Sequence, residues 1–274
     1  MSAATDASPA YSPASDVPML VVDRVSVAFD GLKALDDVSF TVQPGTIHAV
    51  IGPNGAGKST TFNVLSGVYR ATAGSVRFGA AELTTMRPHK IARLGIARAF
   101  QNIALSKGQT VIENLMLGRH ALTRAGFVSS GVRWPATVRE GARHGERVRE
   151  IADFVGLGDK LGQPAGLLSY GDQKRVEVAR ALACEPRLLL LDEPVAGMNS
   201  EETARMAALI AEVRQELGIS IVLVEHDMGL VMGISDRVTV LDFGRLIADG
   251  PPAAVQNDPD VVRAYLGTGE EESR

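Results

Sequence analysis

The sequence has few cysteines and little charge imbalance, and both scarcities exclude classes of protein. Cys184 is the only cysteine among 274 residues, so the chain has no disulfide framework and suits a reducing compartment. Its 28 lysines and arginines are nearly matched by 32 acidic residues, which gives a net charge of -4. Without a basic excess, the chain is not expected to bind nucleic acid.

Long hydrophobic runs are also missing. The longest, residues 188–191 and 219–224, are far shorter than the roughly 20 residues that a membrane-spanning helix needs. Residues 1–18 lack the basic start and apolar stretch of a secretory signal and are expected to form a disordered leader, while residues 269–274 form a charged tail. A role at a membrane would therefore require a separate membrane protein.

The first part of the chain has the patterns of strands and one helix. Residues 20–42 contain short β-branched runs broken by Asp30-Gly31 and Asp36-Asp37, which predicts antiparallel strands. Residues 46–51 then form an apolar strand, and a Gly-rich loop separates it from a helix predicted over residues 58–66. The unit is a strand, a loop and a helix.

Two later strands are expected to lie inside a parallel sheet. Residues 187–191 and 219–224 are continuously apolar, as is typical of strands buried on both faces. Helical spacing predicts a helix between them, with Asn199 and Glu202 capping its start and Gly218 ending it. A strand, a helix and a strand make a parallel crossover unit.

The middle of the chain has no such strand runs. Residues from about 102 to 182 include helix-like stretches at 111–117 and 146–155, and residues 124–145 are predicted to be its least regular part. We interpret this region as a helical subdomain inserted into the sheet domain.

The Gly-rich segment between the strand at 46–51 and the helix at 58–66 matches the whole P-loop pattern. Glycines let backbone N–H groups point at phosphates, and the helix N-terminus adds partial positive charge. Lys58 supplies a full charge for the β and γ phosphates, and Ser59 places a hydroxyl where Mg2+ needs a ligand, with Thr60 the next candidate. The predicted phosphate-binding residues are Gly52, Pro53, Asn54, Gly55, Ala56, Gly57, Lys58, Ser59 and Thr60. The expected fold is α/β, a P-loop NTPase core with a mostly parallel sheet, an antiparallel β subdomain and an inserted helical subdomain.

Polar residues follow the two buried strands where ligands bind in open parallel sheets. Asp192 would hold Mg2+ through a water, and Glu193 would polarise the water that attacks the γ-phosphate. His226 follows the strand at 219–224 in the same way, and its imidazole could hydrogen-bond the γ-phosphate. Gln101 lies near the start of the helical insert, where its amide could meet both metal and water.

These residues, in this order, resemble the nucleotide-binding subunits of ABC transporters, and the resemblance covers nearly all of the chain after Leu20. Its most specific part is Leu168-Ser169-Tyr170-Gly171-Asp172-Gln173, which is similar to the family's signature motif and lies a short helix before the strand at 188–191. The resemblance implies an ABC ATPase domain over residues 19–268, with a helical subdomain at about 102–182 inserted in a RecA-like core.

The resemblance also implies a role for each matching residue. The implied catalytic residues are Glu193, His226 and Gln101, and the implied magnesium ligands are Ser59, Gln101 and Asp192. Phe29 would stack on the adenine of ATP. Ser169 and Gly171 would touch the γ-phosphate of a nucleotide held by a second ATPase subunit. The implied cofactors are ATP and Mg2+.

Two departures from the family pattern bear on rate and coupling. The signature has Tyr170 and Asp172 where glycine and glutamine are usual, and Asn199 replaces the usual aspartate. Because Asp172 stands three residues after Ser169, the pair predicts a capping box, and we expect Asp172 only to cap a helix.

Within the family, four segments are most similar to the ATPases of branched-chain amino-acid importers: residues 91–101, 110–115, 232–237 and 260–267. Relatives that import urea or amides share parts of this pattern. Such an ATPase would lie at the cytoplasmic face of the membrane. Its expected partners are integral-membrane permease subunits and a second ATPase, either a copy or a sister subunit, with a periplasmic or extracellular solute-binding protein as an indirect partner.

Two other classes compete with an importer ATPase. A soluble ABC ATPase of translation or DNA repair usually carries two cassettes, a long coiled coil or a zinc-binding insertion, and the sequence has none of these. A P-loop GTPase would need an Asn-Lys-x-Asp motif, and no asparagine here is followed by lysine.

Overall fold

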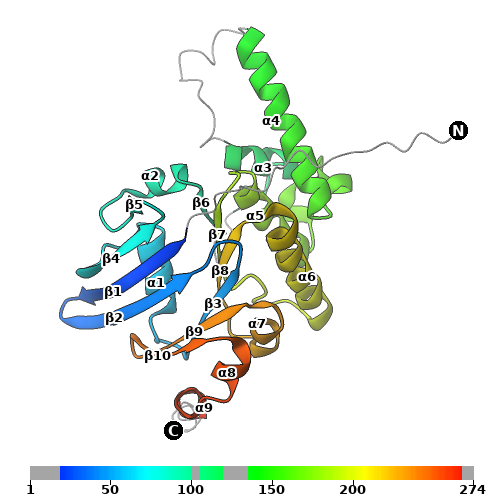
Figure 1. The fold of residues 1–274 in the computed structure, drawn as a ribbon. Coiled ribbons are helices and arrows are strands. Elements are labelled where there is room, and N and C mark those ends of the chain that lie inside the picture. Colours follow the sequence, from blue (N-terminus) through cyan, green and yellow to red (C-terminus); the bar gives the residue numbers. More distant parts are fainter. Residues whose placement is uncertain (1–18, 100–104, 120–134, 267–274) are drawn as a thin grey trace, which may run out of the picture.

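The structure, a computed structural model, describes residues 19–99, 105–119 and 135–266. Within these ranges the chain forms two β-sheets and a group of helices that projects beyond one end of the larger sheet (Figure 1). The predicted leader at 1–18, the predicted tail at 269–274 and Gln101 lie outside the described residues. Across the described ranges, no helix is both long and apolar enough to cross a bilayer.

The larger sheet has the strand order β10-β9-β3-β8-β7-β6, and its neighbours are parallel except for β9 and β10. The strands are β3 (Ile47–Ile51), β6 (Ile96–Ala99), β7 (Leu188–Asp192), β8 (Ser220–Val224), β9 (Arg237–Asp242) and β10 (Arg245–Gly250). The predicted strand–helix–strand unit is present as β7, α6 and β8, so the expected mostly parallel sheet is confirmed.

Both faces of this sheet are covered, which explains why its strands are apolar without alternation. Every residue of β3, β7 and β8 is buried. Leu189 and Leu223 belong to the core shared with α5 and α6, whereas Leu190 and Val222 belong to the core shared with α1 and the second sheet. The interpretation of these runs as doubly buried strands is therefore correct.

The second sheet is antiparallel, with the order β2-β1-β4-β5. Its strands are β1 (Leu20–Phe29), β2 (Leu32–Val42), β4 (Ala73–Phe78) and β5 (Ala81–Glu82). Asp30-Gly31 forms the predicted turn, with φ of 47° and 89°. The predicted break at Asp36-Asp37 is wrong, because β2 continues through these residues. Only the pairing register with β1 shifts there, between Val25 and Val27.

Helix α1 lies between the two sheets and joins them into one core (Figure 1). Phe62 and Leu65 of α1 pack in the cluster that also contains Val25 of β1 and Val50 of β3. The helices on this side are α1 (Lys58–Leu65) and α2 (Pro88–Arg93). This packing fixes the start of α1 against the end of β3.

Helices fill the described part of the chain between β6 and β7, as expected for a helical insert. They are α3 (Val111–Arg119), α4 (Pro135–Phe154) and α5 (Tyr170–Leu182), with 3-10 turns at Gly158–Lys160 and Ala165–Leu167. The expectation of irregular structure is wrong for residues 135–145, because α4 begins at Pro135, a residue suited to the first helical turn. Its C-terminal half packs in the core through Val148 and Ala152, which are completely buried.

The remaining helices follow β7, β8 and β10. They are α6 (Ser200–Leu217), α7 (Met228–Ile234), α8 (Pro252–Gln256) and α9 (Pro259–Leu266). The predicted cap of α6 is confirmed: Asn199 Oδ1 accepts from the Glu202 N–H at 3.0 Å, and Glu202 Oε2 accepts from the Asn199 N–H at 3.1 Å. Gly218 ends the helix with a φ of 62°.

A histidine lies in the centre of the larger sheet. His48 of β3 is completely buried and stacks on Phe40, with ring centroids 5.3 Å apart. Its Nε2 lies 2.8 Å from Thr239 Oγ1 of β9. Burial lowers the pKa of His48 from 6.5 to about 4, because the charged imidazolium would lose its hydration there.

We predict that acid destabilises the fold through His48. An unfolded histidine titrates near pH 6.5, so between about pH 6.5 and 4 the unfolded chain binds a proton that the native chain does not. The free energy of unfolding should therefore fall as pH is lowered through this window, by up to about 3 kcal/mol. Urea denaturation across the window measures it. His48→Met should flatten the response, whereas His89→Gln, at an exposed histidine, should not; equal slopes in all three proteins would contradict the prediction.

Candidate active site

The P-loop lies between the end of β3 and the start of α1, in close contact with its neighbours. A Cβ on Gly52 would lie 2.1 Å from the Leu241 carbonyl oxygen, and one on Gly57 would lie 2.8 Å from that of Ala34. The φ of Gly57 is 101°, which L side chains rarely adopt. These two positions therefore require glycine. Asn54, Gly55 and Ser59 are exposed at the tip and the helix start, where an anion could approach.

The side chain of Lys58 folds back onto the first residues of this loop. Its Nζ donates to the carbonyl oxygens of Gly52 at 2.6 Å and Pro53 at 2.7 Å, and the residue is only 6% exposed. Burial lowers the pKa of Lys58, while the negative charge of Glu193 acts in the opposite direction. The structure thus brings the predicted phosphate-binding lysine and the predicted catalytic acid within electrostatic reach of each other.

The two predicted acids lie at the end of β7. Asp192 is 4% exposed, and its Oδ2 accepts from Arg98 Nη2 at 2.5 Å. Its Oδ1 is buried and has no hydrogen-bond partner among the described residues. Glu193 follows with a φ of 49°, and its N–H donates to the Val224 carbonyl oxygen at 2.9 Å. The backbone therefore leaves the extended strand conformation at Glu193, directly after the end of β7.

Glu193 and His226 are in direct contact, as the prediction of one site requires. His226 Nε2 lies 2.6 Å from Glu193 Oε1, and the two side chains are 47% and 15% exposed. Glu225 supports both loops, because its Oε1 accepts from the Val195 N–H at 2.9 Å and its Oε2 from the His226 N–H at 3.0 Å. Burial raises the pKa of Glu225, and these N–H donors oppose the rise.

Lys174 is a residue of this region that sequence reasoning missed. It is 3% exposed, and its Nζ donates to the Glu193 carbonyl oxygen at 3.3 Å and lies 5.9 Å from the ring centroid of Tyr170. Burial lowers the pKa of Lys174, and the surrounding carboxylates act in the opposite direction. It follows the signature segment directly, but only the fold brings α5 against the end of β7.

The signature segment forms the start of α5. Ser169 is the N-cap and accepts from the Asp172 N–H at 3.2 Å. The expectation that Asp172 only caps the helix is wrong, because its carboxylate pairs with Lys160 at 2.7 Å and with Arg175. Burial by itself raises the pKa of Asp172, but these cations hold it below its usual value. Tyr170 donates its hydroxyl to the Ala196 carbonyl oxygen at 3.0 Å.

The remaining predicted residues are Phe29, Ser169, Gly171 and Gln101. Phe29 is 44% exposed and meets Tyr69 edge to face at 5.1 Å, so it is a surface aromatic rather than a core residue. Ser169 and Gly171 line a depression with Glu202 of α6, so these two residues face α6. Gln101 belongs to residues 100–104, outside the described part of the chain.

The C-terminal helix α9 also reaches the P-loop. Tyr265 packs against the main core, and its phenolic oxygen accepts a hydrogen bond from the Gly52 N–H. Burial raises the pKa of Tyr265 to about 12 despite that bond, so the hydroxyl stays protonated at neutral pH. In the sequence, the signal for Tyr265 was its position within residues 260–267, one of the four segments similar to importer ATPases.

Fold and site together define a P-loop nucleotide-binding protein. Comparison with known proteins identifies the family: the model described as ABC transporter matches residues 35–196, and the one described as branched-chain amino acid ATP-binding cassette transporter matches residues 245–271. The chain belongs to the ABC transporter family, and it is an ATPase of that family. The resemblance noted from the sequence is thereby confirmed.

Individual relatives agree along most of the chain. The high-affinity branched-chain amino acid transport ATP-binding protein LivG of Salmonella typhimurium is 42% identical over 91% of this chain and 98% of its own length. BraF of Pseudomonas aeruginosa, with the same description, is 41% identical over the same shares. The solved ADP conformation of MJ1267, an ATP-binding cassette of an ABC transporter, superposes with a TM-score of 0.80 at 31% identity, covering 92% of this chain and 100% of that one.

Proposed function

We propose that this chain hydrolyses ATP to energise an importer of branched-chain or other hydrophobic amino acids, working at the cytoplasmic face of the membrane. The observation that carries the proposal is the match of residues 245–271 to a family of branched-chain amino acid transporters, beside relatives of that description at 41–42% identity. Both favour this solute class over urea or amides, and transport over a soluble ABC ATPase. A periplasmic or extracellular binding protein would deliver the solute to the permease.

Several groups of the site support ATP hydrolysis as its chemistry. Lys58 and backbone N–H groups of the loop would bind the β and γ phosphates. Glu193 would accept a hydrogen bond from the attacking water. His226, whose Nε2 lies 2.6 Å from Glu193 Oε1, would hold the water or the γ-phosphate in line. Phe29, an exposed aromatic, would stack on adenine.

Mg2+ fits the oxygen atoms that this site leaves open. Asp192 Oδ1 is a buried acceptor without a partner among the described residues, and Ser59 is an exposed residue at the start of α1. A small hard cation prefers such ligands and keeps several waters. Ser59, Asp192 and Gln101 would hold the ion. When bound, it would neutralise charge on the β and γ phosphates.

A second ATPase subunit, a copy of this chain or a sister, would complete the site. Ser169 is exposed at the N-terminus of α5, where unpaired N–H groups suit a γ-phosphate. It is flanked by Leu167, 80% exposed, and Tyr170, 43% exposed. These apolar side chains support a contact surface around the signature, at which ATP would join two cassettes.

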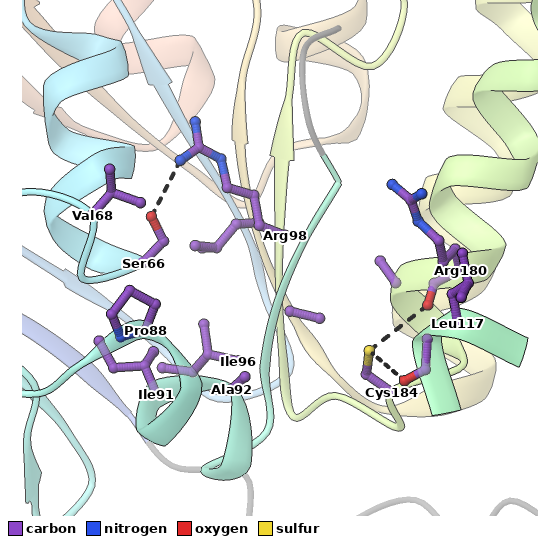
Figure 2. Close-up of a pocket in the computed structure, with 14 residues that line it drawn as sticks. Ser66, Val68, Pro88, Ile91, Ala92, Ile96, Arg98, Leu117, Arg180 and Cys184 are labelled. Atoms are coloured by element: carbon purple, nitrogen blue, oxygen red, sulfur yellow. Dashed lines mark hydrogen bonds between the residues drawn. The ribbon is translucent and has the colours of Figure 1, made fainter. Parts of the chain in front are cut away.

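The permease would dock in a groove between the sheet domain and the helical region. The groove measures about 510 Å3, with Val68, Pro88 and Ile91 on one side and Leu117 and Cys184 on the other (Figure 2). Val68 and Leu117 are 55% and 43% exposed. We take a cytoplasmic helix of the permease as its occupant, because an amphipathic helix is the element that buries its apolar face in such a groove.

Glu193→Gln should leave ATP binding intact and remove hydrolysis. The amide keeps the shape of the side chain but is a poor base, so the rate of ATP hydrolysis should fall by about 10²–10⁴-fold. ATP should then trap a dimer, visible as a change in size by light scattering. Hydrolysis at the wild-type rate would exclude Glu193 as the base.

Mixing two inactive variants tests the shared site. Lys58→Ala should abolish tight ATP binding, and Ser169→Arg should block the signature surface, so each homodimer should be inactive. A mixed dimer has one intact site and one doubly damaged site. Some ATP-dependent dimerisation should therefore return on mixing. If ATP never joins two cassettes and Ser169→Arg works normally in the assembled transporter, the shared site does not exist.

Charge in the groove should prevent permease docking. Leu117→Asp would bury a carboxylate against apolar surface and should weaken co-purification with co-expressed permease subunits at least about tenfold. Val262→Asp is a matched control, because Val262 is also 43% exposed but lies on α9, outside the groove. If Leu117→Asp still binds permease like the control, the groove is not the docking site.

A further inference from the structure

Arg98 connects three parts of the molecule. It lies on β6, where it pairs with Leu190 of β7. Its Nη2 donates to Asp192 Oδ2 at 2.5 Å, while Nη1 donates to Asn63 Oδ1 at 2.8 Å and to Ser66 Oγ at 3.2 Å. One guanidinium therefore ties the acid at the end of β7 to the end of α1.

The surroundings of Arg98 leave this side chain little freedom. Its side chain is 12% exposed and that of Asp192 is 3% exposed. The guanidinium carbon lies 5.7 Å from the ring centroid of Phe62, which is completely buried. The planar fork of arginine can hold several acceptors at once in a fixed geometry, which a lysine cannot do.

This contact decides which oxygen of Asp192 remains available. Oδ2 is taken by Arg98, and Oδ1 is buried without a hydrogen-bond partner among the described residues. A carboxylate held by one oxygen cannot rotate freely, so its second oxygen keeps a fixed direction. Groups that orient a metal-binding carboxylate in this way strongly affect metal affinity.

Arg98 also borders the apolar groove. Arg98 and its partner Ser66 are both lining residues, and Figure 2 shows the hydrogen bond between them at the wall opposite Leu117. A helix seated in the groove would pack beside these two side chains. Any displacement of Arg98 would also move or break its hydrogen bond to Asp192, because the same side chain contacts both Ser66 and Asp192.

We propose that Arg98 is a positioning residue that fixes Asp192 for the magnesium ion of ATP and transmits occupancy of the groove to that carboxylate. The proposal rests on the proposed function, since it takes the magnesium role of Asp192 and the permease groove from it. The alternative is a purely structural role, in which Arg98 only neutralises a buried acid. The two differ in what magnesium does to nucleotide affinity.

The first measurement is the affinity of the full-length chain for a fluorescent, non-hydrolysable ATP analogue, with EDTA and across a magnesium titration. In Arg98→Met the metal-free affinity should stay within about twofold of wild type, while the magnesium concentration for half-maximal effect should rise about tenfold. Arg98→Lys should recover part of the loss, since it restores the charge but not the fork. A structural role alone would lower both affinities by the same factor and would overturn the proposal.

Arg180→Met is the matched control. Arg180 lines the same groove, and its guanidinium pairs with Glu177 at 3.4 Å. It should leave the magnesium response unchanged, and an equal loss in this variant would overturn the proposal. Should Arg98→Met not fold, Asn63→Ala with Ser66→Ala removes only the α1 contacts and keeps the ion pair. It should raise the half-maximal magnesium concentration about threefold, and no rise would count against a positioning role.

The second measurement uses the assembled transporter. Permease subunits should stimulate ATP hydrolysis of the wild-type chain, and Arg98→Met should lose most of that stimulation at saturating magnesium while still co-purifying with the permease. Normal stimulation in this variant would overturn the coupling role. If the permease never binds the wild-type chain, the proposed transport function fails and coupling fails with it, whereas the magnesium titration on the chain alone still decides the positioning role.

Discussion

Parallel pairing of β3, β7 and β8 brings three loops to one edge of the central sheet, and the rest of the site depends on it. Gly52 follows β3, Asp192 ends β7 and Glu225 follows β8. Because parallel strands point the same way, residues far apart in sequence meet without any special turn. The 2.6 Å contact between Glu193 and His226 is the direct result. An antiparallel β8 would have placed His226 at the opposite edge.

Charges gathered at this edge are buried, and neighbouring charges and hydrogen-bond donors stabilise them in place of solvent. Lys58 and Lys174 are almost completely buried, and burial lowers the pKa of each while nearby carboxylates oppose the shift. Each acid has its own hydrogen-bond donors: Arg98 for Asp192, and backbone N–H groups for Glu225. Such a preorganised set of charges costs little reorganisation when a polyanion binds.

The sequence could predict those parts of the site whose chemistry is local. The P-loop, the acids after an apolar strand and the cap at Asn199 each lie within a few residues of the element that they serve. Contacts set by strand register or helix packing could not be predicted: Arg98 meets Asp192 only because β6 pairs with β7. The same holds for Lys174, and for Asp172, whose cation Lys160 lies on a preceding 3-10 turn. Local capping rules predicted only a helix cap for Asp172, because they take no account of partners from other elements.

The departure at Tyr170 gains a physical meaning from the fold. Its hydroxyl binds the Ala196 carbonyl oxygen, three residues after Glu193, and the neighbouring Lys174 binds the Glu193 carbonyl oxygen. The start of α5 is therefore joined to the loop that carries the proposed catalytic acid of the same chain. In the proposed dimer, Ser169 would touch the nucleotide of the other subunit, so strain at that contact would reach Glu193 through two hydrogen bonds. Coupling between two sites requires an element whose position both sites bias, and in the proposed dimer the helix start with its attached loop would be such an element. By this route each nucleotide would affect hydrolysis of the other, and the usual glycine at position 170 has no side chain with which to make the tyrosine contact.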